Sequence, residues 1–249
     1  MKETRPIMGM PISIEICDIN IDARISEKVF SYFASIDERF STHKTGSELS
    51  QINRGELLEH EYSVEMKEVF LLAEKTKQET RGYFDICTPE GYLDPSGIVK
   101  GLAILRAAEL LIQAGSINFY IEAGGDIQTH GHNSWGKPWR VGIKDPFDRA
   151  HIVKIITPYG FGVATSGTYE RGQHIYDPIN KTRSVSDIIS MTVVGSNVYE
   201  ADRFATAAFA MGSRGIAFIE DMPNLEGYSI DQNGIATMTS GFEKFVSNK

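Results

Sequence analysis

The sequence has few cysteines and no long apolar run. Its two cysteines, Cys17 and Cys87, lie far apart and outside any metal-binding spacing. A reducing compartment is therefore a simpler inference than a disulfide. No run approaches the ~18 apolar residues of a membrane-spanning helix. The first residues also lack a signal-peptide apolar core and a lipid-attachment cysteine. We therefore expect a cytoplasmic protein without membrane insertion.

Basic tracts, internal repeats and low-complexity segments are also absent from the sequence. Lys and Arg number 25 against 33 Asp and Glu, which gives a formal net charge of −8. This balance argues against a nucleic-acid partner, and an anionic ligand would need a local positive pocket or a metal. The 249 residues, 41% of them hydrophobic, suit one globular domain over residues 1–249.

The periodicity of apolar residues predicts strands and helices that interleave along the chain. Alternation over residues 12–17 indicates a strand with one buried face, and three- and four-residue spacing over 22–40 indicates an amphipathic helix. No regular βαβ units are visible. We therefore predict an α+β fold, a single domain with mixed, mostly antiparallel sheets and interleaved helices. Further strands are expected at 119–123, 127–131, 139–144, 153–156, 161–164 and 189–194, and a hairpin at 228–237.

The segment after residues 161–164 carries the first candidate chemistry. The apolar run is expected to end at residues 165–167, three small residues that allow a sharp bend and close approach of a ligand. His174 and Asp177 follow, a general acid/base candidate and a carboxylate just past a strand end. An ordinary polar surface loop, with His174 as a structural histidine, fits the same residues.

A second candidate site lies at the start of a predicted helix. Asp94 and Pro95 are a good N-cap and first-turn pair, and helical spacing continues to Gln113 before a glycine C-cap signal. The helix N-terminus presents free amides, and Lys100 lies one turn further on. Together these favour a phosphate or diphosphate ligand. A well-capped surface helix is the alternative interpretation.

A third candidate lies on the helix predicted at residues 198–211. Asp202 and Thr206 are four residues apart and share a helix face with apolar side chains. A buried carboxylate needs a partner, either a hard cation or an arginine such as Arg203 or Arg171. The residues by themselves leave both partners open.

Four blocks, at residues 82–89, 93–103, 163–178 and 201–206, resemble motifs of the FAD:protein FMN transferases, the ApbE-like flavin transferases. The resemblance extends in order from Met8 to about Gly241. It implies Mg²⁺-dependent transfer of FMN from FAD to a Thr or Ser hydroxyl of a target protein, through a phosphoester bond and with release of AMP. The implied partners are FAD and an acceptor flavoprotein with a Thr/Ser flavinylation motif.

The resemblance also implies roles for individual residues. The metal would be bound by Asp202, Thr206 and a backbone oxygen at Gly97. His174 is our candidate for proton transfer, and Asp177 would orient it or the flavin. Contacts to FAD are implied for Met8, His43, Phe84, Asp85, Ile86, Asp94, Lys100, Ile175 and Tyr176.

Two departures from the family pattern affect expected ligand contacts, whereas Pro95 and Ser96 also depart from it but contribute no side-chain ligand. His43 stands where an aromatic side chain usually stacks on the ligand, and Glu122 stands where Asn is common. These departures keep open a flavin-binding protein without turnover. A second enzyme function is also open, an FAD pyrophosphatase in which the same site delivers FMN to water.

Overall fold

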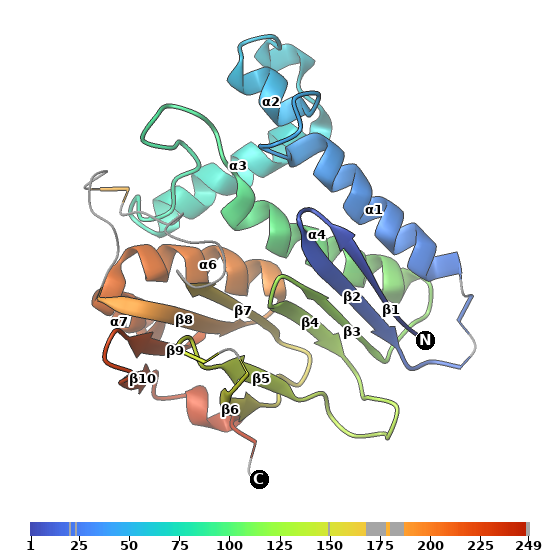
Figure 1. Cartoon of the computed structure of the whole chain (residues 1–249), viewed down its shortest axis with the longest axis vertical. Coiled ribbons are helices and arrows are strands. Elements are labelled where there is room, and N and C mark those ends of the chain that lie inside the picture. Colours follow the sequence, from blue (N-terminus) through green and yellow to red (C-terminus); the bar gives the residue numbers. More distant parts are fainter. Residues whose placement is uncertain (20, 23, 149, 168–177, 180–186, 248–249) are drawn as a thin grey trace.

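The fold is built around one large antiparallel sheet (Figure 1). The structure is a computed structural model and describes residues 1–19, 21–22, 24–148, 150–167, 178–179 and 187–247. Eight strands are ordered β1-β2-β3-β4-β7-β8-β9-β10, and every neighbouring pair is antiparallel. They are β1 (Lys2–Ile7), β2 (Met10–Ile16), β3 (Phe119–Ala123), β4 (Asp126–His130), β7 (Gly162–Gly167), β8 (Ile188–Gly195), β9 (Glu226–Asp231) and β10 (Ala236–Met238). A separate hairpin pairs β5 (Val141–Lys144) with β6 (Ile152–Ile156).

Two long helices, α4 and α6, pack side by side and contact the sheet (Figure 1). α6 contacts β7 and β8, α4 contacts β3 and β4, and α1 and α3 pack on α4. The helices are α1 (Arg24–Phe40), α2 (Glu48–Asn53), α3 (Val64–Glu79), α4 (Ser96–Gln113), α6 (Val198–Ala210) and α7 (Gly215–Asp221), with short 3₁₀ turns at Glu59–Glu61, Gly212–Arg214 and Phe242–Phe245. This arrangement brings the first turn of α4 against the middle of α6.

The core follows the two periodicities of the sequence. On β2, Ile12, Ile14 and Ile16 point toward the helices and are at most 2% exposed, because alternate residues of a strand face the same side. On α1, the buried residues recur at three- and four-residue intervals, as expected for a helix that packs on one face only. α6 is buried on nearly all sides, because it lies between the sheet, α4 and α7.

The predicted end of the strand at residue 164 is wrong. β7 continues through Gly167, with Thr165 opposite Thr192 and Gly167 opposite Ser190 on β8. The small residues continue the strand because β8 supplies its hydrogen-bond partners across the full length. β1 is an addition that the sequence pattern did not predict, since its alternation is charged rather than apolar at this sheet edge.

The predicted start of α4 also needs correction. Pro95, not Asp94, occupies the N-cap position, and the helix begins at Ser96. Asp94 Oδ1 accepts a hydrogen bond from the Ser96 amide at 3.0 Å. The Asp94 carboxylate therefore bonds to the turn that leads into the helix, one residue before the N-cap position. The interaction is an Asx-type turn rather than a helix cap.

The α+β class with mostly antiparallel sheets is confirmed. The predicted hairpin is present as β9–β10, with Gly234 at a φ of 78° in its turn. None of the helices in the described ranges combines the length and apolar composition needed to cross a bilayer. The single-domain organisation over residues 1–249 stays a prediction.

Candidate active site

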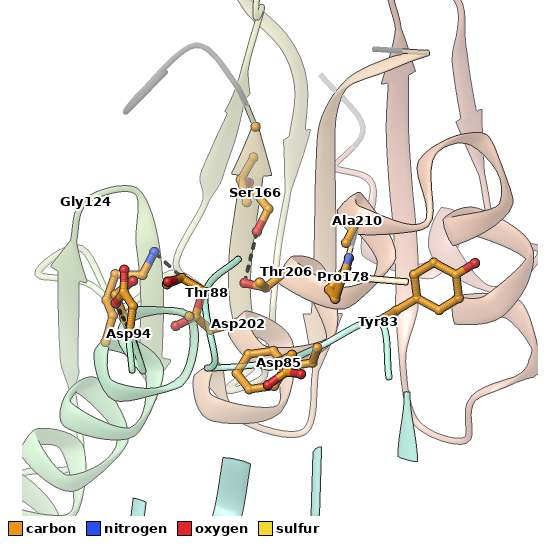
Figure 2. A pocket seen from close by; sticks show the side chains of 16 residues that line it. Tyr83, Asp85, Thr88, Asp94, Gly124, Ser166, Pro178, Asp202, Thr206 and Ala210 are labelled. Atoms are coloured by element: carbon orange, nitrogen blue, oxygen red, sulfur yellow. Dashed lines mark hydrogen bonds and ion pairs between the residues drawn. The ribbon is translucent and has the colours of Figure 1, made fainter. Parts of the chain in front are cut away.

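A cavity of about 120 Å³ opens where α4 begins, β7 ends and α6 passes beneath (Figure 2). It collects residues from segments that are far apart in the sequence. Its lining consists of Tyr83, Phe84, Asp85, Thr88, Asp94, Ser96, Gly97, Lys100, Gly124, Thr165, Ser166, Gly167, Pro178, Asp202, Thr206 and Ala210. Seven of the predicted site residues are among them: Phe84, Asp85, Asp94, Gly97, Lys100, Asp202 and Thr206.

The first turn of α4 forms one wall of this cavity through Ser96, Gly97 and Lys100. A Cβ on Gly97 would lie 3.1 Å from Thr206 Cγ2 and 3.2 Å from the Phe84 ring. Glycine at position 97 therefore allows α4 to approach α6 closely. The backbone of this turn and Thr206 consequently line the same cavity, which suits a ligand held between the two helices.

Asp202 is a buried carboxylic acid in the wall of the cavity. It is 2% exposed, and its Oδ2 accepts a hydrogen bond from the Gly101 amide at 2.8 Å. Burial raises the pKa of Asp202 to about 8, although Lys100, with Nζ 3.6 Å from Oδ1, opposes the shift. A raised carboxyl pKa at a cavity wall marks a group that a bound cation would stabilise in its charged form.

Arg203 is not the partner of Asp202, so that alternative is wrong. Its guanidinium forms ion pairs with Glu79 on α3 and, at 2.5 Å, with Glu200 on α6. It also lies over the Phe204 ring, with Cζ 4.0 Å from the centroid. Consecutive residues of a helix point in directions about 100° apart, so Arg203 faces α3 while Asp202 faces α4. Arg171, the other alternative, lies outside the described residues.

A second buried carboxylate, Asp126, lies beside this pair. It is 0% exposed at the first position of β4. Its Oδ1 accepts from the Thr165 amide at 3.1 Å, and its Oδ2 lies 2.7 Å from Lys100 Nζ. The Lys100 ammonium thus lies between two carboxylates, closer to Asp126 than to Asp202.

The hydroxyl groups of Ser166 and Thr206 also line the cavity. Thr206 Oγ1 lies 3.5 Å from Ser166 Oγ, at the end of β7 (Figure 2). Within the described residues, no three His, Cys, Asp or Glu side chains gather in a metal-binding arrangement. The available donors are a carboxylate, hydroxyls and backbone oxygens, a set that fits a hard cation such as Mg²⁺ and disfavours zinc. The buried Asp202 carboxylate supports the same choice, because it lacks the solvation that would otherwise stabilise its charge.

Tyr83, Phe84 and Asp85 belong to the turn that follows α3, and all three line the cavity. The Phe84 amide donates to Thr80 Oγ1 at 3.0 Å, and Asp85 pairs with Lys77 at 2.8 Å. Both contacts tie the turn to the C-terminal end of α3 and so fix Phe84 and Asp85 at the cavity. Ile86 instead packs against the hydrophobic core and does not belong to the cavity lining.

Two predicted FAD contacts lie elsewhere. His43 lines a neighbouring groove that shares Thr88 and Asp94 with the first cavity. Met8 occupies the β1–β2 turn at a φ of 57° and packs against the core. The remaining predicted site residues, His174, Ile175, Tyr176 and Asp177, lie outside the described residues.

The sequence marks Asp126 as a candidate for a structural or metal-proximal carboxylate, and it marks residues 165–167 as a place of close ligand approach without giving Ser166 a role of its own. The double glycine before Asp126 indicates close approach of the backbone to a ligand or another strand, but it does not reveal that Lys100 lies opposite. That pairing depends on the packing of α4 against the ends of β4 and β7.

The chain resembles known proteins both in sequence and in structure. The profile of the ApbE family matches residues 8–90 and 87–229. A protein from Vibrio cholerae named FAD:protein FMN transferase is 34% identical over 171 residues, which are 64% of this chain and 51% of that protein. A protein of the same name from Escherichia coli is 28% identical over 179 residues, 68% of this chain and 51% of that protein. The chain therefore spans about half the length of the curated relatives it matches.

Solved structures of ApbE proteins have the same fold as this chain. The structure of the flavin transferase ApbE from Vibrio cholerae superposes with a TM-score of 0.85 at 25% identity, covering 98% of both chains. An ApbE protein from Thermotoga maritima superposes with a TM-score of 0.88 at 22% identity, covering 100% of this chain and 99% of that one. The resemblance seen in the sequence motifs is thus confirmed along almost the whole fold, and the chain belongs to the ApbE family.

Proposed function

We propose that this chain transfers FMN from FAD to a Thr or Ser hydroxyl of an acceptor protein, with Mg²⁺ bound and AMP as the leaving group. One observation carries the proposal. The first turn of α4, the Lys100 ammonium and the Asp202–Thr206 pair of α6 all line one cavity. A helix N-terminus and a lysine suit a diphosphate, and an oxygen donor set suits the cation that accompanies it. The relatives named FAD:protein FMN transferase support the same chemistry.

In this proposal, Asp202, Thr206 and a backbone oxygen at Gly97 would hold the magnesium ion. When bound, Mg²⁺ supplies neutralising charge to the diphosphate as the phosphoryl group is transferred. Lys100 and the amides of the first turn of α4 bind the diphosphate oxygens and orient the bond that breaks. Phe84 and Ser166, which are 3% and 8% exposed, form part of the wall of this cavity.

The acceptor hydroxyl forms a bond to the FMN phosphorus while the bond between this phosphorus and the AMP oxygen breaks. His174 takes the proton of the acceptor hydroxyl, and Asp177 orients the imidazole or the flavin. This role rests on the sequence pattern and the family resemblance. Proton transfer of this kind contributes about 10²–10⁴-fold to a rate.

The wider set of FAD contacts is part of the same proposal. Asp94, Phe84 and Asp85 would contact the flavin side of FAD, and His43 in the adjoining groove would lie against the flavin or the adenine ring. The proposed set also includes Met8, Ile86, Ile175 and Tyr176. The Thr/Ser flavinylation motif of the acceptor and the cytoplasmic location are likewise proposed from the sequence.

The test is a flavinylation assay with two readouts. The protein is mixed with FAD, Mg²⁺ and a flavodoxin-like or reductase domain that carries a Thr/Ser flavinylation motif. In-gel flavin fluorescence reports transfer, and chromatography reports AMP. Parallel reactions contain EDTA, or the variant Asp202→Asn, or the control Asp221→Asn, an exposed carboxylate at the end of α7.

We expect fluorescent acceptor and AMP in equal amounts, both lost with EDTA and with Asp202→Asn but not with Asp221→Asn. AMP without labelled acceptor would instead identify an FAD pyrophosphatase. Bound FAD with neither product, unchanged by Asp202→Asn, would identify a flavin-binding protein without turnover.

A further inference from the structure

A buried contact between Asp126 and Lys100 has no role in the reaction described so far. Asp126 is 0% exposed and follows the two-residue turn Gly124–Gly125, whose φ values are 57° and 90°. Such a turn needs φ above zero at both positions and holds the two strands in tight register. Ala123 pairs with Asp126 across this turn. The direction of the Asp126 side chain is therefore fixed by the hairpin itself.

The carboxylate of Asp126 joins three elements of the fold. Its Oδ1 accepts from the Thr165 amide on β7 at 3.1 Å, and its Oδ2 lies 2.7 Å from Lys100 Nζ on α4. A carboxylate without solvent contact requires such partners, since an unpaired buried charge is strongly unfavourable. Asp126 and Lys100 consequently stabilise each other's charge and position.

The Lys100 ammonium lies farther from Asp202 than from Asp126. Lys100 Nζ lies 3.6 Å from Asp202 Oδ1, beyond the distance of about 2.7–2.9 Å at which an ammonium and a carboxylate form a charge-assisted hydrogen bond. The shorter contact is therefore with Asp126, at 2.7 Å. Asp202 Oδ2 is held by the Gly101 amide, so Oδ1 is the atom that Lys100 approaches.

We propose that Asp126 is a positioning residue that holds the Lys100 ammonium away from Asp202. The Asp202 carboxylate then remains available to a divalent cation, and the ammonium stays in the cavity lining for the diphosphate. Without the charge of Asp126, Lys100 closes on Asp202 Oδ1 and competes with the cation. This inference rests on the proposed function, because it concerns the same cation and diphosphate site.

The test is a double-mutant cycle on cation binding, with neither FAD nor acceptor present. Mn²⁺ is titrated into the wild type, Asp126→Asn, Lys100→Met and the double variant. Asn has the shape of Asp and keeps an oxygen for the Thr165 amide. We expect Asp126→Asn to weaken Mn²⁺ binding about tenfold when Lys100 is present and by less than about twofold in the Lys100→Met background. Such non-additive effects are expected for two residues in contact.

Equal effects in both backgrounds would overturn the proposal, because Asp126 would then act through its own charge and not through Lys100. Crystal structures of cation-free Asp126→Asn and wild type give a second readout. We expect the distance from Lys100 Nζ to Asp202 Oδ1 to fall from 3.6 Å to hydrogen-bond length in the variant. An unchanged distance would also overturn the proposal.

Thermal unfolding in EDTA separates this role from a merely structural one. A general loss of packing would lower the melting temperature, but its effect on Mn²⁺ affinity would be the same with Lys100 and in the Lys100→Met background. If Asp126→Asn does not fold, Asp126→Ser takes its place in both experiments, because it also removes the charge. A wild type that binds no Mn²⁺ in the cavity would refute the proposed metal site. A wild type that binds Mn²⁺ but gives an additive cycle would refute only the role of Asp126.

Discussion

The Gly101 amide donates a hydrogen bond to Asp202 Oδ2 at 2.8 Å across the contact between α4 and α6. A Cβ on Gly101 would lie 2.7 Å from Asp202 Cβ and 3.0 Å from its Oδ2. The two helices therefore approach so closely that only glycine fits. One backbone group of α4 thereby fixes the carboxylate that the proposed metal site requires.

Gly101→Ala is expected to damage both stability and cation binding. The added methyl group must push α4 away from α6, at a cost of about 2 kcal/mol for an overpacked core position. Urea unfolding measures the free energy of unfolding, and Mn²⁺ titration measures the site. Gly46→Ala is the matched control because its Cβ would have no neighbour within 4 Å. Equal behaviour of the two variants would contradict this account.

The stability of the cation-free protein should depend on the protonation of Asp202. Its pKa is raised from 3.8 to about 8, chiefly by burial. The folded state therefore binds this proton more tightly than the unfolded state, and the stabilisation is fully present below pH ~4 and lost as the pH rises toward 8. In EDTA, Asp202→Asn should gain stability relative to wild type between these pH values. Chemical unfolding at several pH values tests this, with Asp221→Asn expected to follow the wild type.

Thr206→Val should separate cation binding from folding. The substitution keeps the shape of the side chain and removes the hydroxyl that lies 3.5 Å from Ser166 Oγ. We expect Mn²⁺ affinity to fall by at least the ~10-fold that is typical when even a supporting group of a metal site is lost. The melting temperature in EDTA should change little. Unaltered Mn²⁺ affinity would exclude Thr206 as a ligand, and Thr237→Val on the exposed strand β10 is the control.

Arg203 should contribute to the stability of the fold and not to cation binding. Its side chain is 4% exposed and pairs with Glu79 and Glu200, which are 33% and 26% exposed. Because both partners reach solvent, Arg203→Met should cost about 2 kcal/mol, less than the ~3–5 kcal/mol of a fully buried pair. Arg24→Met removes a pair whose arginine is 90% exposed, and it should leave the free energy of unfolding almost unchanged because exposed pairs contribute little. Urea unfolding of both variants decides the comparison.

The sequence determined those features that depend on local chemistry. The three- and four-residue spacing of apolar residues fixed α1 and α6, the alternation at Ile12, Ile14 and Ile16 fixed β2, and Asn233–Gly234 marked the last hairpin. The spacing of Asp202 and Thr206 also placed both on one helix face. These predictions succeeded because helix and strand periodicity act over a few residues.

Only the tertiary structure decided which partners these residues have. The charge of Asp202 was compatible with an arginine or a cation, and the packing of α6 turned Arg203 toward α3 and Asp202 toward α4. The position of Lys100 between Asp126 and Asp202 depends on residues from α4, β4 and α6. Contacts of this kind arise from long-range packing in three dimensions, and no local pattern in the chain encodes them.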